Sequence, residues 1–379
     1  MYWVDMQQKA CVGTWIFLAA LLVIAACSIS TSNPSGLAST RLGSSQIATP
    51  ASLNGSFALP TALDMVSSTI FLPIITRSSG VEIGAFVGVN PPTTLTVQTF
   101  ESLVGRHIYS VVWYQGWDAV NQPPFPATDL SAVRFHDGYD TGVIPHLTWE
   151  PWVPLTNVIS GTYDAYLTSY AIQVKNWGRP VRLRFAHEMI QNNSLDGHEW
   201  YPWQDQPEQY KSAFRHVHDV FHAAGANNAE FVWCPQNYPF DLNIVELYYP
   251  GADYVDWLCM DGYNSANPWQ WFDDIFYNLY HTFVDHPEVF GVKSVMIGEF
   301  ASCEAGPNQQ SWETKPAWIQ NTFERMKSAD YSRIRAFYWF HINKECNWRA
   351  DSSPQSLPAF KTAISTAAFV SHPISATNR

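Results

Sequence analysis

Residues 181–188, Val-Arg-Leu-Arg-Phe-Ala-His-Glu, contain the feature that decides the fold. The run 181–185 carries the branched and aromatic side chains that are enriched in strands, and the polar residues His187 and Glu188 follow it closely. A strand that leads into chemically active side chains, instead of turn-forming residues, indicates that its end contributes to a site.

Seven further β-rich runs resemble this one. The eight runs cover residues 81–87, 108–113, 143–149, 181–185, 230–234, 254–260, 292–297 and 334–340. Segments long enough for helices separate them, including 164–177, 207–224 and 316–328. Hydrophobic strands that alternate with helices are typical of a parallel sheet covered by helices. We therefore predict an α/β protein with a (β/α)₈ TIM barrel over residues 80–370.

Polar and aromatic residues gather around the ends of most of these runs. In such a barrel, the loops that follow the strands converge on one open mouth, where chemistry collects. The residues we expect to line it, in chain order, are Trp117, Trp149, Glu150, His187, Glu188, Trp200, Trp233, Tyr263, Glu299 and Trp339. Each alone could be an ordinary residue at a strand end, but their common placement favours a site.

Glu188 and Glu299 follow the fourth and seventh runs, which lie across the barrel mouth from one another. Retaining glycoside hydrolysis needs a protonated carboxylic acid and a carboxylate about 5–5.5 Å apart. A lone glutamate at a strand end is more often structural. Two at opposed ends of a tryptophan-rich mouth favour a catalytic pair.

The composition favours a carbohydrate ligand. With 17 Trp, 18 Tyr and 22 Phe, the chain has more aromatic residues than a core of this size needs, and aromatic faces suit sugar rings. The formal net charge of −12 disfavours nucleic acid as a partner. We find no Cys/His cluster with metal-ligand spacing, and we expect no metal, no cofactor and a monomer.

The N-terminal segment predicts export. Lys9 precedes an apolar run that ends in Ala-Ala at 25–26 and Cys27, resembling a bacterial lipobox. Lipid anchoring at Cys27 is favoured over an ordinary cleaved signal or a retained anchor helix. We assign residues 1–27 to the signal, 28–79 to a Ser/Thr/Pro-rich tether and 371–379 to a C-terminal tail. The protein is expected outside the cell or at its surface.

Several short motifs occur in the order and strand placement of a known family. They are RLRFAHEM at 182–189, WYPW at 200–203, FVW at 231–233, YYPG at 248–251, DYVD at 253–256, MDGY at 260–263, IGEF at 297–300 and NWR at 347–349. On these motifs, the chain resembles glycoside hydrolase family 26, a β-mannanase-like family of the large clan of retaining (β/α)₈ enzymes.

The resemblance implies a role for each matched residue. Glu188 takes the place of the general acid/base and Glu299 that of the nucleophile. His187 lies beside the acid, where it would bind the sugar or orient a carboxylate. Tyr263 corresponds to the tyrosine that contacts the nucleophile, and Trp339 would form the floor beneath the cleaved sugar, the alternative being a core residue.

The substrate is left open by two departures from the family pattern. The loop after Met189 carries an insertion before Trp200, and Glu150 follows Trp149 where mannanases more often have histidine. An endo-1,4-β-mannanase is the first expectation, and an endo-β-1,3-1,4-glucanase of the same family is the alternative. A glycan-binding protein without turnover is the alternative from another functional class.

Four cysteines remain after the signal. Cys303 and Cys346 lie in the loops after the seventh and eighth strands, which are neighbours on the catalytic face, so we predict a disulfide between them. Cys234 and Cys259 fall inside strand runs, and we expect them to be buried free thiols.

Overall fold

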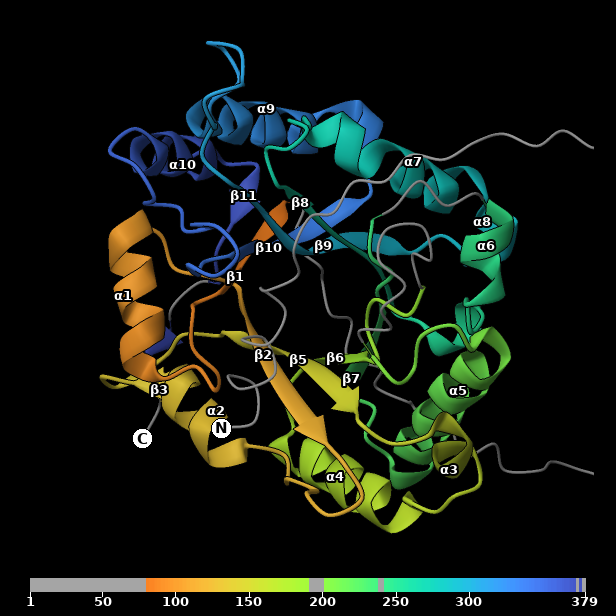
Figure 1. The fold of residues 1–379 in the computed structure, drawn as a ribbon. Helices are drawn as coiled ribbons and strands as arrows, with labels where there is room; N and C mark the ends of the chain where they lie inside the picture. The colour runs from red at the N-terminus through yellow and green to blue at the C-terminus, as the bar shows by residue number, and fades with distance from the viewer. Residues whose placement is uncertain (1–79, 191–200, 238–241, 373–374, 377–379) are drawn as a thin grey trace, which may run out of the picture. The chain divides into compact units, whose positions relative to one another are not determined.

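The computed structural model describes residues 80–379 apart from 191–200, 238–241, 373–374 and 377–379. Eight parallel strands close into a barrel, in which β1 pairs with β2 on one side and with β10 on the other (Figure 1). The strands are β1 Val81–Phe86, β2 Ser110–Trp117, β5 Ile144–Pro151, β6 Val181–Phe185, β7 Ala229–Trp233, β8 Trp257–Asn264, β9 Ser294–Ser302 and β10 Ile334–Phe340. The predicted (β/α)₈ barrel is confirmed.

Helices surround the barrel in Figure 1. They are α1 Thr94–Val104, α2 Ala127–Arg134, α3 Leu155–Ile159, α4 Asp164–Trp177, α5 Pro207–Ala224, α6 Leu242–Leu247, α7 Phe272–Asp285, α8 Pro287–Phe290, α9 Lys315–Lys327 and α10 Ser356–Ile364, with 3₁₀ turns at Ala252–Tyr254 and Ala329–Tyr331. The bounds of α4 and α5 match the prediction. Helix α5 begins with proline, whose missing N–H costs nothing there, and is capped by the following residue, Gly225, with a left-handed φ of 76°.

Side chains alternate between the barrel interior and the helix layer, because successive residues of a strand point to opposite faces. On β6, Phe185 packs against Phe214 of α5, whereas Arg184 reaches across the interior to Glu299 of β9. The outer layer is therefore apolar and aromatic, and the inner layer contains most of the polar groups.

A buried ionic network closes the lower part of the barrel. Arg182 pairs with Glu82 of β1 and Glu230 of β7, and it donates to the Tyr338 hydroxyl at 2.8 Å. The Tyr338 hydroxyl in turn donates to Ser110 at 2.9 Å. Because buried charges must be paired, this network fixes five strands against one another below the mouth.

Four strands extend further toward the mouth than the hydrophobic runs predicted, among them β2, which ends at Trp117. β5, β8 and β9 end at Pro151, Asn264 and Ser302, so Glu150, Tyr263 and Glu299 stand on the strands themselves rather than in the loops. Continued pairing across β8 and β9, with Tyr263 opposite Ala301, supports this extension. Side chains on strands are held more rigidly than side chains on loops.

Short strands near the C-terminus attach the last residues to the barrel domain. β11 Phe369–Val370 pairs with β1, and β12 Ser375–Ala376 pairs with β4 Tyr139–Asp140, which is hairpinned with β3 Phe135–His136. The predicted signal and tether lie outside the described residues. No helix among the described residues is long and apolar enough to cross a membrane.

Two disulfides join neighbouring strands or loops. Cys303 and Cys346 are bonded, with Cα atoms 5.8 Å apart, as the loop placement predicts. The expectation of free thiols at Cys234 and Cys259 is wrong, because these residues form a second disulfide. They are buried as expected, but Cys234 directly follows β7 and Cys259 lies within the neighbouring strand β8, so that their Cα atoms are 4.3 Å apart, within bonding reach.

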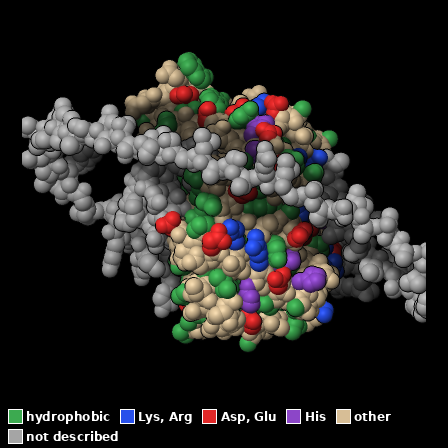
Figure 2. All heavy atoms as spheres, turned by 90° about the vertical axis from the view of Figure 1, so that its right-hand side faces the viewer, with side chains coloured by type: hydrophobic (Ala, Val, Ile, Leu, Met, Phe, Trp, Pro, Cys, Tyr) green, Lys and Arg blue, Asp and Glu red, His purple; other side chains and the backbone are tan. Residues whose placement is uncertain are grey.

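The outer surface carries charges of both signs. Figure 2 shows the side on which α5, α6 and α8 lie in Figure 1, and the coloured acidic, basic and histidine side chains are interspersed there. No basic patch forms among the described residues on this face.

Candidate active site

Glu299 is the most heavily hydrogen-bonded carboxyl group in the barrel mouth. Its Oε1 accepts from the Tyr114 hydroxyl of β2 at 2.5 Å and from Arg184 Nη2 at 2.5 Å. Its Oε2 accepts from the Tyr263 hydroxyl of β8 at 2.6 Å, the contact that the resemblance implies for Tyr263. Donors from three strands therefore fix the carboxylate in position and orientation.

These donors keep Glu299 ionised. Burial by itself would raise the pKa of the carboxyl group, but the Arg184 charge and the hydrogen bonds from Tyr114 and Tyr263 outweigh burial and lower it. A carboxylate that stays charged in a buried mouth suits the role of a nucleophile.

Arg184 is itself fixed by buried partners. Its Nη1 donates to Asp261 at 2.7 Å, and its Nε donates to Thr148 at 2.9 Å. The residue before Glu299 is Gly298, where an added Cβ would lie 2.5 Å from Asp261 Oδ1 and 3.0 Å from Arg184 Nη1. Only glycine leaves room for this arrangement directly below Glu299.

Glu188 follows β6 in an unusual backbone conformation. Ala186 and Glu188 have φ values of 48° and 51°, a left-handed region that costs a residue with a side chain about 1–3 kcal/mol. The Glu188 N–H donates to the Cys234 carbonyl at 2.8 Å, and Gln204 donates to the Glu188 carbonyl at 2.7 Å. The indole N–H of Trp203 donates to the carbonyl of His187, the residue before Glu188. These contacts stabilise the strained segment that presents the Glu188 side chain.

The Glu188 carboxyl group differs electrostatically from Glu299. Burial raises its pKa to about 8, and the nearby negative charge of Glu299 adds to this effect. At neutral pH, Glu188 is thus mainly a protonated acid while Glu299 is an anion. Two carboxyl groups whose pKa values are shifted in opposite directions are the arrangement that acid-assisted glycosidic cleavage requires.

His187 is buried beside this pair. Its Nε2 lies 3.4 Å from the Tyr201 hydroxyl, and its ring faces Tyr114 at a centroid distance of 6.2 Å. Burial and the Arg184 charge lower its pKa to about 3, so the ring is neutral near pH 7. Its predicted contact with the sugar stays a prediction.

Glu150 adds a third carboxyl group to the mouth. It is 2% exposed, and its Oε2 accepts from Trp152 Nε1 at 3.4 Å, whereas its Oε1 is buried without a hydrogen-bond partner. Burial raises its pKa to about 7, with a further contribution from the charge of Glu299.

Four of the predicted binding tryptophans do not face the mouth. Trp117 and Trp149 pack against each other and against Tyr166 of α4. All four are 0–1% exposed, and they stand on the outward-facing positions of their strands. Strand alternation explains the error, since Trp149 must point away from the interior if its neighbour Glu150 points into it.

Trp233 and Trp339 illustrate the same alternation. Trp233 packs against Phe283 of α7, and Trp339 packs against Trp318 of α9 and Phe360 of α10. The core alternative for Trp339 therefore holds. Trp200 lies outside the described residues.

Trp348, in the loop after β10, packs against Tyr263, one of the hydrogen-bond donors to Glu299. Its ring lies 4.9 Å from the Tyr263 ring. Buried Lys315 donates to the carbonyls of Asn347 and Arg349, the residues on either side of Trp348, at 2.9 and 2.8 Å. The NWR motif at 347–349 contains Trp348, but no role was predicted for this residue. Tyr114 and Arg184 were also missed, although both stand near the mouth ends of predicted strands.

One cluster of side chains has the composition of a metal site. Cys234, Cys259 and Asp261 place their ligand atoms within 4.8 Å of one another. The two sulfurs are bonded to each other, and Asp261 is paired with Arg184, so this cluster offers no free thiolate to a metal.

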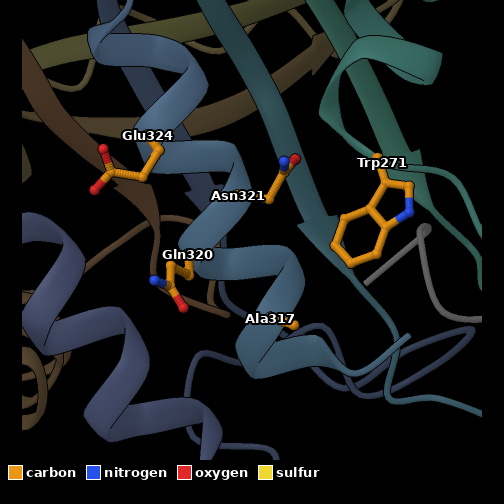
Figure 3. Close-up of a pocket in the computed structure, with 5 residues that line it drawn as sticks. All are labelled: Trp271, Ala317, Gln320, Asn321 and Glu324. Atoms are coloured by element: carbon orange, nitrogen blue, oxygen red, sulfur yellow. The ribbon is translucent and has the colours of Figure 1, made fainter. Parts of the chain in front are cut away.

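A surface groove on the helix layer lies apart from this chemistry. Trp271 and residues of one face of α9 line it: Ala317, Gln320, Asn321 and Glu324 (Figure 3). Its one carboxylate, Glu324, is paired with Lys327 at 2.7 Å. The groove contains no group suited to glycosidic cleavage.

Comparisons with known proteins agree with this geometry. The family model described as Glycosyl hydrolase family 26 matches residues 156–300. Endoglucanase H of Acetivibrio thermocellus is 34% identical over 311 residues, which cover 76% of this chain and 31% of that protein. The chain thus spans about a third of the length of this relative.

Two solved mannanase structures share the fold. The catalytic domain of the Bacillus sp. JAMB-750 GH26 endo-β-1,4-mannanase matches with a TM-score of 0.55 at 17% identity, covering 77% of this chain and 87% of that one. A Cellulomonas fimi endo-β-1,4-mannanase double mutant matches with a TM-score of 0.56 at 17% identity, covering 78% and 73%. The family match over residues 156–300 and the likeness to Endoglucanase H make the chain similar to glycosyl hydrolase family 26, and the solved structures show a shared barrel fold.

Proposed function

We propose that the protein is a retaining, endo-acting hydrolase of a β-linked polysaccharide. The observation that carries this proposal is the opposite perturbation of two carboxyl groups in one barrel mouth. Glu188 has a pKa raised to about 8, and Glu299 has a lowered pKa and three hydrogen-bond donors.

The reaction proceeds in two steps. In the first, the Glu299 carboxylate attacks the anomeric carbon while Glu188 gives its proton to the leaving glycosidic oxygen, forming a covalent glycosyl-enzyme. In the second, Glu188 takes a proton from water, and the water oxygen displaces Glu299 from the anomeric carbon. Tyr114, Tyr263 and Arg184 hold Glu299 in place through both steps.

We propose a β-glucan with 1,4 linkages, such as mixed-linkage β-1,3-1,4-glucan, as the substrate in place of the β-mannan expected first, and the likeness to Endoglucanase H supports this choice. Identity to Endoglucanase H is 34%, whereas identity to the mannanases of known structure is 17%. Glu150 also stands where mannanases more often have histidine. β-Mannan is the second candidate, because the two mannanases share the barrel.

The alternative function, glycan binding without turnover, explains fewer features of the barrel mouth. Binding alone needs neither the raised pKa of Glu188 nor the strained backbone that presents it. Strain of this kind is concentrated at active sites.

We further propose that the protein acts outside the cytoplasm as a monomer, exported by residues 1–27 and anchored by a lipid at Cys27. Two disulfides suit an oxidising compartment. Mass spectrometry of the mature N-terminus tests the anchor: an acylated Cys27 supports it, and an unmodified terminus contradicts it.

Reducing-sugar release from barley β-glucan, glucomannan, galactomannan and xylan tests the proposed activity. We expect the highest kcat/KM on β-glucan. A higher value on galactomannan would assign the enzyme to mannan instead, and no release from any of the four by correctly folded protein would overturn the proposed hydrolase.

A further inference from the structure

We propose that Glu150 and Trp152 form a sugar-binding subsite beside the reaction centre, in which Trp152 stacks on a sugar and Glu150 accepts one of its hydroxyl groups. This inference rests on the proposed function, because it assigns the recognition of the polysaccharide to particular residues.

The first observation is the incomplete hydrogen bonding of Glu150. Only Oε2 has a partner, the indole N–H of Trp152, and Oε1 is buried with none. A buried polar atom without a partner is costly and uncommon in a native protein, so this oxygen calls for an explanation. A hydroxyl donor supplied by a ligand satisfies it.

The second observation is the exposure of Trp152. Trp152 is 37% exposed, in contrast to the buried tryptophans of the outer layer. It follows the end of β5 at the mouth, and its ring contacts the rings of Tyr201 and Trp203 at centroid distances of 5.9 and 5.5 Å. An aromatic ring that is braced from behind and partly open to solvent suits the apolar face of a pyranose.

The third observation is the glycine opposite the pair. A Cβ at Gly116 of β2 would lie 3.1 Å from Trp152 Cδ1 and Nε1, and 3.7 Å from Glu150 Oε2. The absence of a side chain there lets the indole lie close to the strand, in reach of the carboxyl group.

The place of the pair relative to the catalytic glutamates defines which sugar it would bind. Glu150 stands on β5, the neighbour of β6 that leads to Glu188, and its charge raises the pKa of Glu188. The charge of Glu299 likewise raises the pKa of Glu150. The subsite is therefore next to the reaction centre but is made by residues that do not hold the nucleophile, so we assign it to the sugar adjacent to the one that is cleaved.

The test uses aryl β-glucosides of one to four sugars, with a common leaving group, and the variants Glu150→Gln and Trp152→Ala. In the wild type, we expect kcat/KM to rise as sugars are added. In both variants, we expect the gain in kcat/KM from added sugars to fall about tenfold or more relative to wild type, as for a lost hydrogen bond to a carboxylate. Trp152→Phe keeps a ring but loses the indole N–H, so its gain in kcat/KM from added sugars should lie between those of the wild type and Trp152→Ala.

Glu101→Gln is the matched control. Glu101 is also buried, but both of its oxygens have partners, His107 and the Ile108 N–H, close to the start of β2 and so at the opposite end of the barrel. We expect it to change thermal stability without changing the dependence on chain length.

Binding separates this inference from the proposed function. Cellotetraose binding to the Glu299→Ala variant, measured by calorimetry, should weaken about tenfold when Glu150→Gln is added. If the wild type hydrolyses nothing but this weakening is seen, the function fails and the subsite stands. If both variants keep the wild-type gain from added sugars, or Glu150→Gln lowers kcat/KM equally on all four glycosides, the subsite is refuted.

Discussion

Arg184 Nη2 lies 2.5 Å from Glu299 Oε1 and joins the interior of β6 to the proposed nucleophile on β9. The guanidinium carries a permanent charge in a buried setting, where it lowers the pKa of the carboxyl group most effectively. Its planar fork also reaches Asp261, so the geometry depends on arginine and not on charge alone.

We therefore expect Arg184→Lys to lower kcat on the order of a hundredfold, a loss typical of a preorganised charge contact. The acidic limb of the pH profile should also move to higher pH, because the single ammonium group of lysine cannot reproduce the guanidinium contacts with both Glu299 and Asp261. Arg182→Lys is the comparison: it weakens the ionic network below the mouth and should lower the melting temperature without moving that limb. An unchanged acidic limb in Arg184→Lys would contradict the assigned role.

The two catalytic carboxyl groups predict a bell-shaped pH profile of kcat/KM. Glu299 must be ionised, and its pKa is lowered, so activity should persist to pH values below the usual range of a glutamate. Glu188 must be protonated, and its pKa is raised to about 8, so activity should fall as the pH rises through that value. Tyr263→Phe removes one hydrogen-bond donor to Glu299. It should move the acidic limb to higher pH and leave the basic limb unchanged. A basic limb below pH 6 would show that Glu188 is not the acid.

Replacement of either glutamate should remove most of the turnover. We expect Glu188→Ala to lower kcat about 10²–10⁴-fold, the range for a general acid, and Glu299→Ala to lower it at least as far. Azide should partly restore activity to Glu299→Ala, because a small anion can enter the space left by the carboxylate and attack in its place. Near-normal activity in either variant, with correct folding checked by circular dichroism, would remove the assignment.

The Cys303–Cys346 disulfide should stabilise the loops after β9 and β10. Cys346 lies two residues before Trp348, so the bond also restrains the loop that places this ring against Tyr263. We expect the Cys303→Ala/Cys346→Ala double variant to unfold with a free energy lower by about 2–4 kcal/mol, measured by denaturant titration. Mass spectrometry of a non-reduced digest provides the direct check. Recovery of the two peptides unlinked from exported protein would contradict the pairing.

The barrel and the positions of Glu188 and Glu299 at its mouth could be predicted from sequence because they depend on local patterns. The run 181–185 coincides with β6, and 334–340 coincides with β10, since branched and aromatic residues fill buried strands. Glu188 follows the first of these runs within three residues. No long-range contact was needed to locate it.

The binding residues were harder to predict, because their direction depends on the phase of each strand. Trp149 and Trp339 lie near strand ends at the mouth but point into the helix layer, whereas Glu150 and the loop residue Trp348 face the site. The alternation of side chains could have separated Trp149 from Glu150. The loop position of Trp348 depends on Lys315, which is distant in sequence, and local patterns carry no signal for that contact.

The stereochemistry of the first product tests the central claim, double displacement by Glu299 and Glu188, most directly. Proton NMR at early times of hydrolysis, before mutarotation, distinguishes the two anomers of the released reducing end. If Glu299 forms a covalent intermediate, the first product keeps the β configuration of the substrate. Initial release of the α anomer would mean that water attacks directly, and it would contradict the assignment of Glu299 as the nucleophile.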